Sequence, residues 1–390
     1  FLNKFFPAGF YYKTFMWPKS FWHKVYEPII RRAAGFGAAS INHDKERYEH
    51  KYEYCDLLIT GSGPSGLASA YAAAQNGAKV ILAEDKPRYG GSLLTSEVTI
   101  GNQSGQEWAE KIISELKSMP NVIVKNRSQV FGYYDHNMLV MSERISDHLP
   151  KTEKYSPKQR LWYIRAKEAI ISSGSIERPL VFGNNDTPGV MLSSAAKEYL
   201  KIYGVLVGKK PLVFTNNDSG YETAIEFKKN GIDPIILDTR KDPNSEIIKE
   251  AKDLNINIKF SYVVVAAKGY KKVKSADIAK ISEDKKNISN IENIDCDCIC
   301  VSGFWTPTIH LASQSGNKTK FNEEIDAFIP SQSKQKETTL GSANGIFTLE
   351  ETLKTSFEKG NELSKQITNK ENKVSVPTVV EKKSSSHDKF

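Results

Sequence analysis

Residues 61–66 read GSGPSG, and this stretch limits the possible folds more than any other in the chain. It follows the apolar run CDLLIT and precedes LASAYAAAQNG, which predicts a helix of small residues. A strand, a glycine-rich turn and a helix in this order are typical of a Rossmann-like dinucleotide-binding unit. In such a unit Gly61 permits the tight turn, Gly63 lets the backbone approach a pyrophosphate, and Gly66 lets helix and strand pack closely.

The turn also predicts which groups would contact the phosphates of a nucleotide. The helix that follows presents free N–H groups and the positive end of its dipole, and both favour a phosphate. The residues expected in this part of the site are Gly61, Gly63, Pro64, Ser65 and Gly66.

A second strand, AKVILAE, ends in the charged residues Glu84, Asp85 and Lys86. A carboxylate at this place accepts hydrogen bonds from ribose hydroxyls and would repel a 2′-phosphate. The pattern therefore favours NAD or FAD over NADP. The next loop, RYGGSLL, places Gly91 and Ser92 near the pyrophosphate or its ribose.

The remaining expected contacts come from segments further along the chain. Val130 lies in a strand that would offer backbone groups to the adenine, while Ala343 and Thr348 flank the cofactor from a late loop, LGSANGIFTLEE. In flavoproteins of this fold that loop carries a Gly-Asp pair, and a strand enters Ala-Thr-Gly where this chain has SSG, residues 172–174. Both losses favour NAD over FAD as the single cofactor. Arg178, shortly afterwards, is expected either to meet a phosphate across an interface or to form a structural ion pair.

A second strand–turn–helix pattern, PLVFTNNDSGYETA, has lost two of its three glycines. Thr215 and Asn217 stand where the first two belong, and Gly220 keeps the third. Asparagine tolerates a left-handed backbone, so we expect the turn to form while its side chains fill the space of a pyrophosphate. The fold class predicted is α/β, a flavoprotein-type fold with two Rossmann-like FAD/NAD(P)-binding domains and a degenerate second site.

The same patterns suggest how the chain is divided. The segments expected are an aromatic docking arm (1–40), a charged linker (41–54), a first dinucleotide-binding domain with a β-meander (55–200), a degenerate second domain (201–310), a return to the first domain (311–367) and a disordered linker to a missing C-terminal domain (368–390). The arm is named for the twelve aromatic residues in positions 1–36, which could instead pack on its own domain.

Composition limits the classes of partner and the cellular location that we expect for this chain. The net charge of +8 comes from lysines spread along the chain, often beside Glu or Asp, so we expect no nucleic-acid partner. No apolar run is long enough to span a membrane, and the start lacks the features of a signal peptide. With only four cysteines, we expect a reducing, cytoplasmic location and neither a metal site nor a redox-active disulfide.

Several long stretches make a more specific match. They are FFPAGFYYKTFMWP, KVYEPIIRRAAG, GSGPSGLASA, GGSLL, FGYYDHN, ERISDHL, GSIERPLVFGNNDTPGVML, VFTNNDSGY and HLASQSG. Through them, residues 5–365 resemble the alpha subunits of bacterial heterotetrameric sarcosine oxidases.

This resemblance implies a tightly held NAD at Ser65, Glu84, Asp85, Lys86, Ser92 and Val130, with less closely aligned contacts at Ala343 and Thr348. It implies beta, gamma and delta partner subunits, FAD on the beta subunit and FMN at the alpha–beta interface. It also implies that sarcosine is demethylated to glycine, with oxygen as electron acceptor and tetrahydrofolate, bound by the missing C-terminal domain, as one-carbon acceptor. No catalytic residue is expected in this chain.

Two other functions remain open at this point. One is a self-sufficient FAD-dependent NAD(P)H oxidoreductase, which the eroded second turn disfavours. The other is a non-catalytic assembly module with a vestigial nucleotide site, which the intact first turn and Glu84 disfavour.

Overall fold

The computed structural model describes residues 17–370 except 36, 38, 39, 152 and 154, together with 372, 374–382 and 387. It divides into two compact units, residues 1–46 and 47–390. In the first unit, η2 (Trp22–Tyr26) is followed directly by helix α2 (Glu27–Ala33). Helix α2 lies within the aromatic arm, and its Pro28 is in the first turn, where proline is tolerated. Residues 1–16 of the arm lie outside the described residues.

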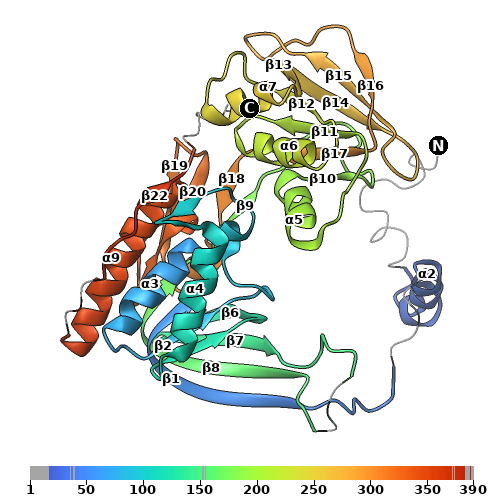
Figure 1. The fold of residues 1–390 in the computed structure, drawn as a ribbon. Coiled ribbons are helices and arrows are strands. Elements are labelled where there is room, and N and C mark those ends of the chain that lie inside the picture. The colour runs from blue at the N-terminus through green and yellow to red at the C-terminus, as the bar shows by residue number, and fades with distance from the viewer. Residues whose placement is uncertain are drawn as a thin grey trace. The chain divides into compact units, whose positions relative to one another are not determined.

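The second unit is built around a seven-stranded sheet (Figure 1). Its strands run in the order β5-β2-β1-β8-β7-β6, and β21 also pairs with β8. Their bounds are β1 (Tyr48–Thr60), β2 (Val80–Ala83), β5 (Val122–Lys125), β6 (Ser128–Tyr134), β7 (Met138–Arg144), β8 (Gln159–Ile171) and β21 (Glu337–Thr339). The pairs β5–β2, β2–β1, β1–β8 and β21–β8 are parallel, while β6, β7 and β8 form the expected antiparallel meander.

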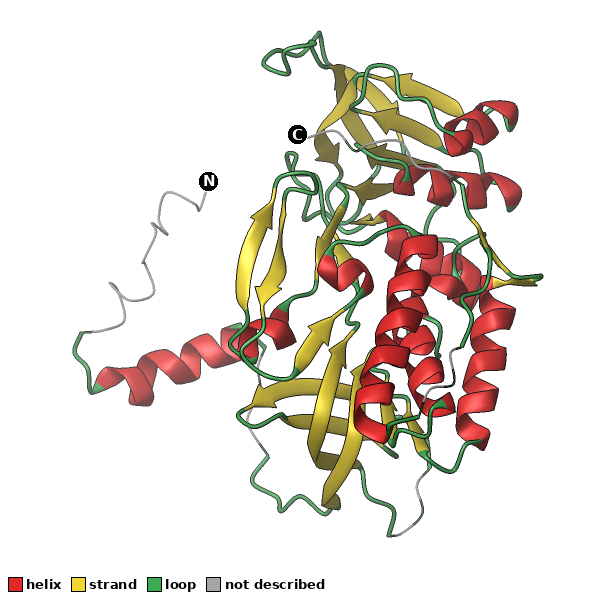
Figure 2. Ribbon diagram, turned by 90° about the vertical axis from the view of Figure 1, so that its left-hand side faces the viewer, coloured by secondary structure: helices red, strands yellow, loops and turns green. Residues whose placement is uncertain are grey.

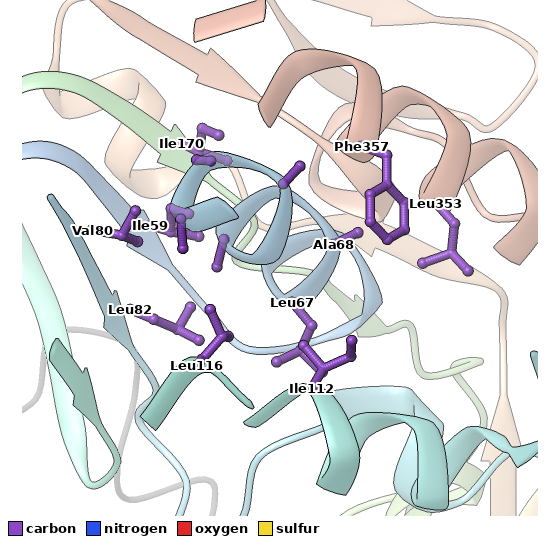
Figure 3. Packing of buried hydrophobic residues seen from close by; sticks show 14 of the residues in the cluster. Ile59, Leu67, Ala68, Val80, Leu82, Ile112, Leu116, Ile170, Leu353 and Phe357 are labelled. Carbon is purple, nitrogen blue, oxygen red and sulfur yellow. The ribbon is translucent and has the colours of Figure 1, made fainter. Parts of the chain in front are cut away.

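Three helices cover one face of this sheet, and Figure 2 shows them side by side. They are α3 (Pro64–Gln75), α4 (Gly105–Ser118) and α9 (Leu349–Thr368). Alanines of α3 allow close packing, and α4 begins with a capping box in which Ser104 and Glu107 bond each other's backbone amides. Figure 3 shows the resulting core, where Leu67 of α3 lies near Ile112 of α4 and Ala68 lies near Leu353 and Phe357 of α9. We call this sheet with its helices the first region.

The second region contains a five-stranded parallel sheet in the order β10-β17-β11-β12-β13. Its strands are β10 (Val190–Leu192), β11 (Pro211–Thr215), β12 (Ile235–Asp238), β13 (Asn257–Phe260) and β17 (Cys298–Ser302). One face packs on α5 (Ser193–Tyr203), α6 (Ser219–Lys229) and α7 (Glu246–Asp253), and the other on the antiparallel sheet of β14 (Tyr262–Lys268), β15 (Ser275–Lys280) and β16 (Glu292–Asp295). The two Rossmann-like regions confirm the predicted fold class.

Short elements complete the second unit. They are η3 (Gly91–Leu94), β3 (Thr99–Ile100), β4 (Gln103–Ser104), β9 (Ser175–Glu177), β18 (Trp305–Pro307), α8 (His310–Gln314), β19 (Lys318–Asn322), β20 (Ala327–Gln332), η4 (Gly341–Asn344) and β22 (Val379–Val380). The antiparallel pair β9–β18 lies where the chain crosses between the two regions.

Three expected boundaries differ from the structure. Residues 48–54, expected as linker, form the first half of β1, because Tyr48–Thr60 pairs with Gln159–Ile171 along its whole length. Residues 190–200 join the second region through β10 and α5 rather than the first. The expected disordered tail contains β22, which pairs with β3. At residues 48–54 the alternation of half-buried and exposed residues in a polar stretch conceals the strand.

Candidate nucleotide-binding site

The three glycines of residues 61–66 differ in the space around them. Gly61 has φ +94°, and a Cβ there would lie 2.4 Å from the carbonyl oxygen of Ser172. A Cβ on Gly66 would lie 1.9 Å from the carbonyl oxygen of Gly61. Gly63 has no such neighbour: nothing lies within 4 Å of the position of its Cβ. The outer glycines are therefore needed to build the turn, and the middle one leaves open space where the backbone can meet a ligand.

Helix α3 presents its N-terminus to that space. Its first intrahelical bond runs from Leu67 N to the carbonyl oxygen of Gly63 (3.0 Å), so the amides of Ser65 and Gly66 have no acceptor within the helix. Pro64 lacks an amide hydrogen and lies in the first turn. The side chain of Ser65 turns away to Ser356 of α9, with the two hydroxyl oxygens 2.8 Å apart. The backbone of this turn, rather than its side chains, is thus left to bind an anion.

Glu84, at the end of β2, reaches back to the glycine turn. One carboxylate oxygen accepts bonds from the amide (2.8 Å) and hydroxyl (2.6 Å) of Ser62, and the other accepts from the amide of Lys86 (2.9 Å). Burial and the neighbouring Asp85 side chain raise the pKa of Glu84 to about 7. A carboxylate has about four acceptor positions, so these bonds leave room for a ribose hydroxyl.

Two further loops lie against the glycine turn. A Cβ on Gly91 would lie 2.8 Å from the Cα of Gly63, so the double-glycine loop lies directly beside the open position. From the late loop, a Cβ on Gly341 would lie 3.0 Å from the Cβ of Ser65. Ala343 is fully buried in this loop, and Thr348 is the N-cap residue of α9. Segments far apart in sequence are therefore brought together here.

The other predicted contacts lie around the end of β2. Val130, half-buried on β6, follows two residues after Ser128, whose amide donates to the carbonyl oxygen of Glu84 (2.7 Å). Asp85, Lys86 and Ser92 are exposed. The ammonium of Lys86 bonds both carboxylate oxygens of Glu198 on α5 (2.8 and 2.9 Å), so this cation already has an acidic partner from the second region.

The second turn is filled by its own side chains. The amide nitrogen of the Asn217 side chain donates to the carbonyl oxygen (3.1 Å) and hydroxyl (3.2 Å) of Ser302, while its oxygen accepts from Ser219 N (2.8 Å). None of residues 215–219 has a positive φ, so Asn217 does not adopt the left-handed backbone that the sequence allowed. The hydroxyl of Thr215 closes the turn instead: it donates to the carbonyl oxygen of Asn217 and accepts from the amide of Asn217. Gly220 keeps its packing role, since a Cβ there would lie 2.6 Å from the Cβ of Thr215.

A buried ion cluster occupies the end of β12. Arg240 pairs with Asp218 (2.9 Å) and with Asp238 (2.8 Å), and the hydroxyl of Tyr221 donates to Asp238 (2.7 Å). Asp238 holds the position that corresponds to Glu84, but its side chain is fully buried among these partners. In the second region this acidic residue therefore stabilises the fold.

Sequence reasoning missed several residues that support the site. Ser62 and Ser172 bond or pack on the first turn, Ser356 fixes Ser65, and Glu198 holds Lys86. Of these residues, only Ser172 was indicated by a sequence pattern, the SSG stretch. The guanidinium of Arg178, for which the sequence suggested a phosphate contact or an ion pair, donates to the carbonyl oxygens of Ile325 (2.9 Å) and Asp326 (3.0 Å).

The geometry defines a dinucleotide-binding fold with one open turn and one filled turn. Residues 55–335 match the family model described as pyridine nucleotide-disulphide oxidoreductase. This match spans most of the sequence, and the chain belongs to that oxidoreductase family.

Curated relatives confirm the more specific resemblance. The chain is 40% identical over 344 residues to a sarcosine oxidase subunit alpha from Rhizobium meliloti, which covers 88% of this chain and 34% of that protein. A sarcosine oxidase subunit alpha from Corynebacterium sp. strain P-1 is 31% identical, covering 84% and 34%. The chain thus spans about a third of the length of these relatives.

Two solved structures with low sequence identity resemble this chain in their fold only. Thioredoxin reductase from T. acidophilum has a TM-score of 0.61 at 15% identity and covers 80% of this chain and 99% of that one. L-proline dehydrogenase from P. horikoshii has a TM-score of 0.58 at 19% identity, covering 85% and 58%. Among the described residues, no helix has the length and apolar character needed to cross a bilayer.

Proposed function

We propose that this chain is the NAD-holding portion of a sarcosine oxidase alpha subunit. The first region binds one NAD at residues 61–66, with its pyrophosphate on the amides of Ser65 and Gly66 and its adenosine ribose on Glu84. The single observation that supports this most strongly is the open space at Gly63, which has no counterpart at Asn217. One nucleotide, in the first region, is the stoichiometry that follows.

The choice of NAD rests on the acidic end of β2. Glu84 is buried beside the turn, and Lys86 is paired with Glu198, so a 2′-phosphate would meet carboxylates rather than a free ammonium at these positions. The late loop has Ser342 where a flavoprotein would carry an aspartate, which disfavours FAD. The remaining proposed contacts are Gly61, Gly63, Pro64, Asp85, Gly91, Ser92, Val130, Ala343 and Thr348.

The reaction is assigned through the relatives named above. We propose that beta, gamma and delta subunits complete the assembly, that sarcosine is oxidised on a FAD of the beta subunit, and that electrons reach oxygen through an FMN at the interface. Tetrahydrofolate accepts the one-carbon unit in a part of the alpha subunit beyond this sequence. This chain contributes binding and orientation of NAD and no catalytic side chain. A cytoplasmic location fits its four cysteines, all unpaired and buried.

The nucleotide released from the purified chain tests this proposal. The protein is denatured, and the supernatant is analysed by absorbance and mass spectrometry. About one equivalent of NAD without flavin is expected. A chain that carries FAD, with or without a nicotinamide nucleotide, would instead indicate a self-sufficient reductase. A chain that carries no nucleotide would favour an assembly module.

A pair of variants separates the two turns. Gly63→Val places a branched side chain in the open space and should give protein without NAD, while Asn217→Ala in the second turn should leave the NAD content unchanged. If Asn217→Ala loses the nucleotide and Gly63→Val keeps it, the assignment of the site is wrong.

A further inference from the structure

The C-terminal segment 378–382 contacts both walls of the first nucleotide site. The carbonyl oxygen of Thr378 accepts from Gly101 N (2.7 Å), and β22 pairs with β3, the strand that follows the double-glycine loop. The next residue, Glu381, accepts bonds from the amides of Leu349 (2.9 Å) and Glu350 (3.1 Å) at the start of α9. We call residues 378–382 the clamp.

Glu381 stabilises a helix end that has no cap of its own. Thr348 is the N-cap residue of α9, but its side chain makes no capping bond. The carboxylate of Glu381 supplies two acceptors and a negative charge at the positive end of a 20-residue helix. The wall that carries Ala343 and Thr348 is thereby attached to the tail of the chain.

Packing transmits the position of the clamp to the glycine turn. On the α9 side, Ser356 bonds the hydroxyl of Ser65, and a Cβ on Gly341 would lie 3.0 Å from the Cβ of Ser65. On the β3 side, a Cβ on Gly105 would lie 2.9 Å from Val98 and 3.2 Å from Leu93, so the residue before β3 and the double-glycine loop both pack against the start of α4.

Charged groups attach the clamp to the second region as well. Lys382 bonds Glu250 of α7 and lies 3.5 Å from Glu97, which precedes β3. Lys229 of α6 lies 2.8 Å from Glu97 and 3.2 Å from Glu250. Two cations and two anions from both regions therefore meet at the clamp.

We propose that Glu381 is a positioning residue of the first nucleotide site, and that the clamp must open before the bound nucleotide leaves. This inference rests on the proposed function, because it requires a nucleotide in the first region. Glu381 does not touch the nucleotide; it fixes the start of α9, while Thr378 and β22 attach the same segment to β3.

The test follows the exchange of bound nucleotide. The 390-residue chain is purified with its NAD and mixed with an excess of isotopically labelled NAD, and the labelled fraction is measured by mass spectrometry after rapid gel filtration. Glu381→Ala should speed exchange about fivefold, because the loss of a helix cap costs about 1 kcal/mol, which corresponds to a factor of about five. Glu381→Gln, which keeps one acceptor oxygen, should stay within about twofold of the unaltered chain.

Two controls distinguish the clamp from general loosening. Glu358→Ala removes an exposed carboxylate from the same helix and should leave the exchange rate unchanged. Ile278→Val removes a buried methyl group from β15 of the second region and lowers stability without touching the clamp. If Glu381→Ala exchanges nucleotide no faster than Glu358→Ala, or no faster than Ile278→Val, the clamp hypothesis is wrong while the proposed function stands. If the unaltered chain carries no nucleotide, both fail.

Salt provides an independent measurement. Because the four charges around Lys382 are partly exposed, raising the salt concentration screens them and should accelerate exchange in the unaltered chain. In Lys382→Met the same increase in salt should have a smaller effect. An equal salt response in both proteins would count against the charged part of the clamp.

Discussion

The two strand–turn–helix units of this chain share a backbone plan and differ in what fills the turn. In both, the third glycine is tightly enclosed: Gly66 by the backbone of Gly61, and Gly220 by the side chain of Thr215. At the middle position Gly63 faces open space, whereas Asn217 bonds Ser302 and Ser219. The comparison separates two requirements, since the third glycine serves the fold and the second serves the ligand. A region can therefore lose its ligand and keep its architecture.

Gly66→Ala should have the largest effect. Its Cβ would meet backbone that cannot move aside, and we expect a loss of about 5 kcal/mol or more in the free energy of unfolding, or no folded protein. The counterpart Gly220→Ala meets a side chain and should cost about 2 kcal/mol. Urea unfolding of both variants measures the difference. Equal losses would mean that the two turns are not packed as described.

Arg240→Met tests the ion cluster of the second region. It leaves Asp218 and Asp238 buried without their cation, and we expect the free energy of unfolding to fall by about 3–5 kcal/mol. The control Arg144→Met breaks an exposed pair with Asp147 and should cost less than about 1 kcal/mol. Calorimetry distinguishes them. A small effect of Arg240→Met would show that the cluster does not stabilise the second region.

Gly63→Val tests whether the open space of the first turn is needed to bind the nucleotide. NAD affinity should fall at least about 100-fold, or roughly 2.7 kcal/mol, while the unfolding midpoint changes little. The reverse change, Thr215→Gly with Asn217→Gly, should not create a second site, because Arg240 and its acidic partners remain. Isothermal titration gives both numbers. A stoichiometry near two in the double variant would show that the side chains of Thr215 and Asn217 exclude a nucleotide without help from the ion cluster.

The smallest effect is the pH dependence that Glu84 gives to the first region. With a pKa of about 7, its carboxyl gains a proton as the pH falls, and a neutral carboxyl is a weaker acceptor for a ribose hydroxyl than a carboxylate, so NAD affinity should fall by up to about tenfold for each pH unit below 7. The sign is opposite for the nucleotide-free fold. The folded chain holds this proton more tightly than the unfolded chain, so the contribution of Glu84 to stability is lost as pH rises through about 7. Glu84→Gln should abolish both dependences, as titrations from pH 5.5 to 8.5 would show.

The sequence predicted the first strand–turn–helix segment well because each glycine there has a separate steric role. It also predicted that the second turn would fill, but not how: the side-chain bonds of Asn217 and the pairing of Arg240 with Asp218 depend on strands that meet only in the fold. Strand β1 was predicted from Cys55, seven residues late. Its first half alternates half-buried and exposed residues, and Tyr52 stacks on Tyr163 at 5.0 Å between ring centroids, which composition cannot reveal.

The contacts of the late loop and the tail also depend on the fold and could be predicted only in part from the sequence. Ala343 was expected near the cofactor from the flavoprotein pattern, and its loop does lie against Ser65. Nothing in the local sequence indicated that Glu381 would reach the amides of Leu349 and Glu350, because that contact joins residues more than thirty positions apart. Long-range caps of this kind follow from tertiary packing and have no sequence pattern.

The strand pair β9–β18 restricts how this chain can vary. Glu177 accepts a bond from the amide of Ser194 in the second region (2.7 Å), while the next residue, Arg178, bonds the carbonyl oxygens of Ile325 and Asp326. Neighbouring side chains of a strand point in opposite directions, and deleting one residue would exchange their directions. The crossing segment therefore has a fixed length. Natural insertions or deletions between residues 175 and 178 would separate the two regions, whereas the exposed loop at 282–287 could change in length without that consequence.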